Sequence, residues 1–89
     1  MKVKFFAYLR DYTNTKSLDI ENYETLEELL YELCNTFGEK LKKAIFDGEN
    51  LSNEIIIMVN GRHIVHLDGL KTKLMDNDEI SIFPVVAGG

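Results

Sequence analysis

The two glycines at the end of the sequence, Gly88 and Gly89, are the residues best suited to chemistry. Glycine has no Cβ, so a Gly-Gly segment fits through a narrow channel and its carbonyl group is open to attack from any side. The pair therefore favours a domain that uses its C-terminus. The alternative is an end without function, since chain termini are often disordered and tolerate small residues.

The residues before the glycines form a short tail behind a strand-like run, residues 79–83. The expected tail consists of Pro84, Val85, Val86, Ala87, Gly88 and Gly89. Pro84 cannot donate to a sheet ladder, so we expect it to end the strand or lie at its edge and to restrict the exit angle. Six extended residues span at most about 20 Å, enough to reach a buried pocket of a docked partner.

The residues before the tail must position it, and most of these segments have the sequence pattern of β-strands. Residues 2–9 and 17–20 predict a hairpin with a polar loop. Residues 54–59 are apolar on both faces, and the Asn-Gly pair that follows predicts a type I′ turn into residues 62–65. Residues 79–83 predict the last strand.

One helix separates the first two strands from the rest. Thr25 and Glu28 form a capping box at its start, and Gly38 is a natural end. Its apolar stripe consists of Leu26, Leu29, Leu30, Leu33 and Phe37, which indicates core packing. Residues 41–46 predict a short second helical segment. This order of elements predicts an α+β fold of the β-grasp (ubiquitin-like) type, a mixed five-stranded sheet packed on one main helix. We expect residues 1–83 to form this domain and residues 84–89 the flexible tail.

Composition narrows the function classes. The 89 residues fit one domain, and the net charge of −5 disfavours nucleic acid, which needs a basic surface. No run approaches the ~20 apolar residues of a membrane span, and the start does not resemble a signal peptide. The single cysteine, Cys34, excludes a disulfide framework and fits a reducing compartment, so we expect a cytoplasmic protein.

Other candidate sites are weak. No nucleophile elbow or phosphate-binding glycine loop is visible, and we expect no enzyme, no metal and no bound cofactor. His63 and His66 could share a metal, but surface or turn histidines are the simpler interpretation. The acidic turn at residues 76–79 lacks the calcium-loop spacing and is expected to be solvated. Cys34 is expected to be a small buried hydrophobe.

A partner surface follows from the strand alternation. Val3, Phe5 and Ala7 are expected to face the helix, together with Ile80 and Ile82. The opposite face then carries Phe6, Tyr8, Met58 and Phe83, with Ile56 beside them. An exposed apolar patch on an antiparallel sheet face indicates an interface. The alternative is a curled sheet that buries this face itself.

Three segments resemble the small subunit of molybdopterin synthase. They are residues 5–10 (FFAYLR), residues 59–61 (VNG) and residues 76–89, which end FPVVAGG. The resemblance extends over the whole chain in length and element order, and it is most specific in the last segment. One departure is Val85, where that family usually has a second proline, which makes the tail less stiff.

The resemblance implies a ubiquitin-like sulfur carrier. An ATP-dependent activating enzyme would adenylate the carboxylate of Gly89, and a sulfur donor enzyme would convert it to a thiocarboxylate. The tail would then deliver its sulfur to a pterin precursor in the large subunit of molybdopterin synthase. That subunit would hold the catalytic residues, so this chain would be a non-catalytic subunit.

Three alternatives remain at this point. The acceptor could belong to thiamine, cysteine, tungstopterin or transfer-RNA thiolation pathways, which share the Gly-Gly end. The chain could instead be a protein modifier, conjugated through Gly89 to lysines of its targets. It could also be a non-covalent interaction module, whose tail would be dispensable.

Overall fold

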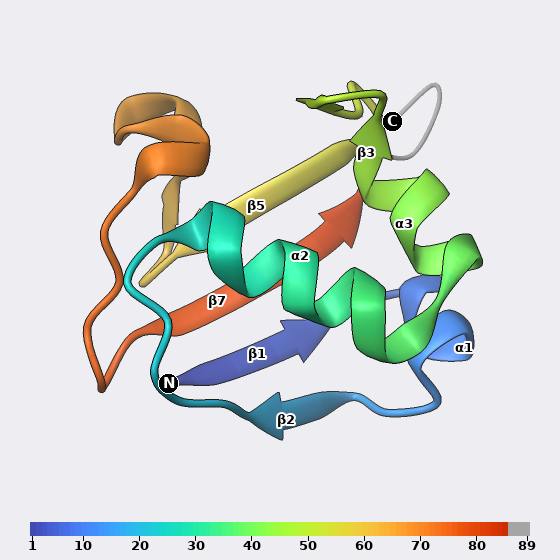
Figure 1. Cartoon of the computed structure of the whole chain (residues 1–89), viewed down its shortest axis with the longest axis horizontal. Coiled ribbons are helices and arrows are strands. Elements are labelled where there is room, and N and C mark those ends of the chain that lie inside the picture. Colours follow the sequence, from blue (N-terminus) through green and yellow to red (C-terminus); the bar gives the residue numbers. More distant parts are fainter. Residues whose placement is uncertain (86–89) are drawn as a thin grey trace.

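The computed structural model describes residues 1–85 and places one mixed sheet at the centre of the molecule. Its strands are β1 (Lys2–Phe5), β2 (Ser17–Asp19), β5 (Ile55–Val59), β6 (Arg62–His63) and β7 (Glu79–Pro84), in the order β2-β1-β7-β5-β6. β1 and β7 run parallel in the middle, and the other pairs are antiparallel. Figure 1 shows α2 (Leu26–Phe37) lying across one face of this sheet. The arrangement is the expected β-grasp fold.

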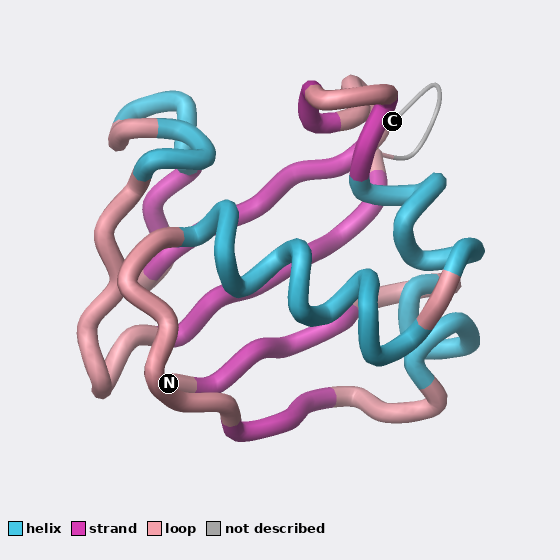
Figure 2. The backbone as a smooth tube through the Cα atoms, viewed as in Figure 1, coloured by secondary structure: helices cyan, strands magenta, loops and turns pink. Residues whose placement is uncertain are grey.

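Shorter elements close the ends of the sheet (Figure 2). These are α1 (Leu9–Thr13), α3 (Glu39–Ile45), a small hairpin of β3 (Phe46–Asp47) and β4 (Asn50–Leu51), and the 3₁₀ turns η1 (Ile64–His66) and η2 (Gly69–Lys71). α3 is the short helical segment that the sequence predicts. Among the described residues, no helix has the length and apolar character needed to cross a membrane.

The start and end of α2 follow from its sequence. The Glu28 amide donates to the Thr25 hydroxyl at 3.3 Å, which satisfies one free N–H of the first turn. The Glu28 carboxylate in turn accepts the amide of Glu24 at 3.2 Å, one residue earlier than a standard capping box. Gly38 ends the helix at φ 96°, a backbone conformation that favours glycine.

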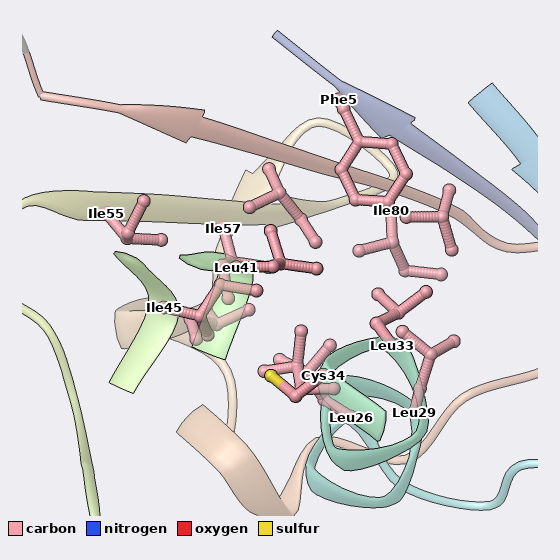
Figure 3. Packing of buried hydrophobic residues seen from close by; sticks show 14 of the residues in the cluster. Phe5, Leu26, Leu29, Leu33, Cys34, Leu41, Ile45, Ile55, Ile57 and Ile80 are labelled. Carbon is pink, nitrogen blue, oxygen red and sulfur yellow. The ribbon is translucent and has the colours of Figure 1, made fainter. Parts of the chain in front are cut away.

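The core lies between the sheet and the two longer helices (Figure 3). The fully buried members from the sheet are Val3, Phe5, Ile57, Ile80 and Ile82, and those from the helices are Leu9, Leu26, Leu29, Leu30, Leu33, Leu41 and Ile45. Phe5 packs edge to face on Phe37 of α2, with ring centroids 5.9 Å apart. Truncating one of the buried leucines to alanine costs about 2–5 kcal/mol, so this interface holds the helix on the sheet.

The Asn60-Gly61 turn is also as expected, with φ 53° and 81° as a type I′ turn requires. The Asn60 side chain accepts the amide of Glu79 at 2.9 Å and donates to Asp78 at 2.8 Å. The β5–β6 turn is therefore tied to the start of β7, which fixes the register of the strand that leads to the tail.

The first strand is shorter than the alternation predicts. β1 ends at Phe5, the Phe6 amide still donates to the Ile82 carbonyl at 3.1 Å, and Ala7 then adopts a left-handed conformation with φ 54°. The chain turns there into α1, which the sequence analysis did not predict. Leu9 is buried as expected, but from a helix, and Ala7 is exposed rather than facing the core.

Two other strand ends differ from expectation. β6 stops at His63, because Ile64–His66 form a 3₁₀ turn in which the Val65 amide donates to His63 Nδ1 at 3.1 Å. β7 runs through Pro84, which is buried and pairs with Ile55. Pro84 is therefore the last residue of the sheet instead of the first residue of the tail.

Candidate functional site

The exit of the tail from the sheet is fixed by one backbone hydrogen bond. The Val85 amide donates to the Glu54 carbonyl oxygen at 2.8 Å, one step beyond the last β7 pair. The Val85 side chain is 46% exposed. The expected reactive residue Gly89 and its neighbours Val86, Ala87 and Gly88 lie outside the described residues. Four residues beyond Val85 reach at most about 14 Å, less than the 20 Å allowed for a tail starting at Pro84.

The helix-free face of the sheet carries an apolar surface beside this exit. Phe6, Ile56, Met58 and Phe83, which we call the aromatic patch, are all partly exposed there. Phe83 is directly opposite Ile56, and its ring meets that of Phe6 edge to face with centroids 5.8 Å apart. All four residues belong to the predicted surface, which also included Tyr8. Because all four side chains remain partly exposed, the sheet does not bury this face completely by itself.

Arg10 of α1 is a member of this surface that the sequence analysis missed. Its Nε donates to the Phe5 carbonyl oxygen at 2.9 Å, and its Cζ lies 5.5 Å from the centre of the Phe6 ring. The hydrogen bond and the cation–π contact hold the guanidinium against one edge of the patch. Arg10 was missed because the turn at Ala7 was not predicted. In a strand continuing to residue 9, Arg10 would lie beyond the end of the strand.

Tyr8 does not lie on the aromatic patch, contrary to expectation. The left-handed Ala7 takes Tyr8 out of the strand alternation, and its ring packs against Tyr12 with centroids 5.6 Å apart. Its neighbours include Lys40 and Lys43 of α3 and Glu54. Tyr8 therefore borders the tail exit from the side of α1 and α3.

The opposite end of the same sheet face is polar. Lys4 and Glu79 form an ion pair of 3.0 Å there, and the Asp78 carboxylate accepts hydrogen bonds from Asn60 and from the Met75 amide. The acidic turn is solvent-exposed as expected, and Asp78 in addition makes hydrogen bonds that hold the turn in place. Within residues 1–85 no group of three or more potential metal ligands occurs.

The two histidines lie close together but are poorly suited to hold a metal. The rings of His63 and His66 are 6.4 Å apart, centre to centre. His63 Nδ1 already accepts the Val65 amide, so the neutral ring carries its proton on Nε2 and has no free lone pair for a ligand bond. The geometry favours a capped turn.

Cys34 is buried on α2, 7% exposed. Burial raises the pKa of its thiol to about 11, an effect that the nearby Lys42 reduces and Glu39 reinforces. Because the thiolate is the nucleophile, the thiol is nearly unreactive at neutral pH. Cys34 therefore acts as a small core residue.

Comparison with known proteins places the chain in one family. The ThiS family model matches residues 3–89. Over its full length the chain is 35% identical to small archaeal modifier protein 3 of Haloferax volcanii, covering 98% of that protein.

Two solved structures are similar over nearly the whole chain. Small archaeal modifier protein 1 of Methanosarcina acetivorans is 39% identical, with a TM-score of 0.88 over 99% of this chain and 94% of that one. A putative molybdopterin converting factor, subunit 1, from Pyrococcus furiosus is 28% identical, with a TM-score of 0.75 over 96% and 95%. The chain belongs to the ThiS family of ubiquitin-like sulfur carriers and modifiers.

Proposed function

We propose that this chain is a sulfur carrier whose reactive group is the carboxylate of Gly89. The observation that carries the proposal is the fixed end of β7: the Val85 amide is held by the Glu54 carbonyl oxygen, and Phe83 places the aromatic patch two residues before Val85. A partner can grip the patch and receive the tail at the same time. The reach of about 14 Å beyond Val85 suits a short channel.

The chemistry needs an activated carbonyl, because a carboxylate is a poor electrophile. An activating enzyme would transfer AMP from ATP to the Gly89 carboxylate and release pyrophosphate. The terminal sulfur of a donor persulfide would attack the carbonyl, AMP would leave, and a second thiol would reduce the acyl disulfide to the thiocarboxylate. Small glycines at this position leave the carbonyl open to each attack. This chain binds no cofactor in the scheme, and the ATP belongs to the activating enzyme.

The proposed acceptor is a pterin precursor, with this chain as the small, non-catalytic subunit of molybdopterin synthase. Two things support it: the segments at residues 5–10, 59–61 and 76–89, and the similarity to the molybdopterin converting factor subunit from P. furiosus. The large subunit would supply the catalytic residues and a pocket for the tail. Val85 stands where that family usually has a second proline. This difference weakens the assignment of the acceptor but not the proposed carrier role.

The aromatic patch is proposed to dock both the activating enzyme and the large subunit. The patch adjoins the tail exit, so we expect two partners that both receive the tail to cover the same four side chains. The two partners would therefore compete for one copy of the carrier. A ternary complex containing one carrier and both partners would contradict the shared surface.

A second candidate is a protein modifier, joined through Gly89 to lysines of target proteins. The names of two relatives, small archaeal modifier proteins 3 and 1, favour it. The same adenylate serves both roles, but a lysine amine then attacks the carbonyl in place of sulfur. Isopeptide-linked adducts recovered from cells would support the modifier. Recovery of only free and thiocarboxylated chain would support the carrier.

Intact-mass measurement tests the proposed function directly. The chain is incubated with its activating enzyme, ATP and a sulfur donor, after its C-terminal residue has been confirmed as Gly89. We expect a mass change equal to one oxygen replaced by sulfur, which disappears when the large subunit and the pterin precursor are added. A carrier that keeps its original mass with every such enzyme would rule out the proposal.

A further inference from the structure

A hollow lined by tyrosines and lysines adjoins the tail exit on the side of α1 and α3. It has a volume of about 440 Å³ and is lined by Tyr8, Tyr12, Lys40, Lys43, Ala44 and Glu54. We call it the Tyr–Lys hollow. The proposed sulfur-carrier chemistry uses none of these side chains.

The backbone turn that forms this hollow is strained at Ala7. Ala7 has φ 54°, a conformation that an L-residue with a Cβ adopts with strain of about 1 kcal/mol or more. The strained turn directs Tyr8 toward Tyr12 and leaves it 43% exposed. Exposed tyrosines that combine a flat apolar ring with a hydroxyl are typical of protein interfaces.

The charge of the hollow runs against that of the whole chain. Lys40 and Lys43 are three residues apart on α3, so they lie on one face of the helix. In residues 1–85 the ion pairs are Lys4–Glu79 and Lys71–Glu27, so neither lysine is paired, even with Glu54 in the same hollow. Two unpaired cations on a chain with net charge −5 are complementary to a negatively charged partner.

The position of the hollow decides which partner this is. Glu54 lines the hollow, and its carbonyl oxygen accepts the Val85 amide at 2.8 Å. Figure 1 places the end of β7 at the same end of the molecule as α1 and α3. A protein that encloses the tail must surround the exit at Val85. It therefore meets the aromatic patch on one side and the Tyr–Lys hollow on the other.

We infer that the Tyr–Lys hollow docks an acidic segment, rich in aspartate and glutamate, of the protein that activates the tail. The inference rests on the proposed function and deepens it. Lys40 and Lys43 pair with the carboxylates, and the rings of Tyr8 and Tyr12 form the apolar floor beneath them. The activating protein would contact the aromatic patch with an apolar surface and the Tyr–Lys hollow with an acidic one. Together these two contacts allow only one rotation of the carrier about its tail.

Charge reversal on α3 tests the inference. The double variant Lys40→Glu/Lys43→Glu is compared with Lys73→Glu/Arg62→Glu, which makes the same charge change on exposed residues away from the exit. Binding to the adenylating enzyme of the same organism is measured at 50, 150 and 500 mM salt, values chosen because screening lengths range from roughly 4 to 14 Å over this interval. Circular dichroism confirms that each variant is folded.

We expect the α3 variant to bind about tenfold or more weakly at low salt and to lose most of its salt dependence. The control should stay within about threefold of the wild type, and Lys40→Arg/Lys43→Arg should bind normally because the charge is kept. Equal losses in the α3 variant and the control would overturn the inference, as would wild-type binding by the α3 variant. If the wild type is never adenylated, the proposed function itself is wrong. If the wild type and the α3 variant are adenylated alike, only the docking role of the Tyr–Lys hollow is refuted.

Discussion

The rings of Phe6 and Phe83 meet edge to face across the parallel strands β1 and β7, with centroids 5.8 Å apart and planes inclined by 84°. The guanidinium of Arg10 also packs over the Phe6 ring, and Phe83 lies opposite Ile56. The pair is thus fixed in place before any partner arrives. Little side-chain entropy remains to be lost on docking, which favours tight binding by a small surface.

Replacing Phe83 by alanine should weaken binding of the activating enzyme by more than tenfold, because aromatic side chains at the centre of an interface typically contribute about 2 kcal/mol or more. The measurement is the dissociation constant from titration calorimetry. Val65→Ala is the matched control, since Val65 is 68% exposed and lies on η1, outside the patch. Unchanged affinity of the Phe83 variant would remove the patch from the interface.

The sequence was sufficient for elements whose local signals and burial agree. The α2 stripe predicts the buried leucines, and the Asn60-Gly61 pair predicts the turn that the structure has. The set Phe6, Met58 and Phe83 followed from the period of two in the strands. In each case the local sequence preference and the burial of the residues favour the same structure, so no knowledge of distant parts of the chain was needed.

The region around Ala7 could not be predicted in this way. Residues 2–9 alternate as a strand should, but the hydrogen bond from Phe6 to Ile82 is followed by a left-handed alanine that no propensity favours. Tertiary packing of Leu9 and of α1 on α3 overrides the local pattern there. The misplaced Tyr8 and the missed Arg10 both follow from this single turn.

Ala7→Gly should stabilise the domain by about 1 kcal/mol, because glycine adopts φ 54° without the clash of a Cβ, although it loses more backbone entropy on folding. Ala7 is exposed, so no packing is lost. The midpoint of urea unfolding at constant slope measures the change. Ala7→Val should do the reverse, since a β-branched residue is least tolerant of this conformation. A glycine variant that is less stable than the wild type would show that the turn is not strained.

Cys34 should react with thiol reagents far more slowly in the folded chain than in the unfolded one. Burial raises its pKa to about 11 from the ordinary thiol value of 9.0, so the thiolate fraction at pH 7 falls by about a hundredfold. The labelling rate should rise about tenfold per pH unit until the pH approaches 11. The check is the rate of reaction with an aromatic disulfide reagent at pH 7, 8 and 9, in buffer and in denaturant. Equal rates in the two conditions would place the thiol on the surface.

The same pKa shift has a consequence for stability. Because the folded-state pKa lies above the unfolded value, the folded state keeps the proton more tightly, and this contribution is fully present below pH 9. It is lost as the pH rises from 9 toward 11. Comparing the pH dependence of unfolding for the wild type and Cys34→Ala isolates the contribution of this thiol. The wild type should lose stability more steeply than the variant above pH 9.

Gly89→Val should impair adenylation while leaving the fold intact. The buried residues that the structure describes extend to Pro84 in β7, and the substitution changes none of them. A valine side chain at the reacting carbonyl must fit a channel shaped for glycine, and one oversized group of this kind costs about 1–3 kcal/mol, or roughly 10- to 200-fold in kcat/KM. ATP–pyrophosphate exchange measures adenylation, and the thermal midpoint, expected to be unchanged, controls for folding. A variant with one alanine added after Gly89 gives a second comparison, because the carboxylate then moves one residue further along the channel. Normal exchange by both variants would mean that the terminal glycine is not the activated residue.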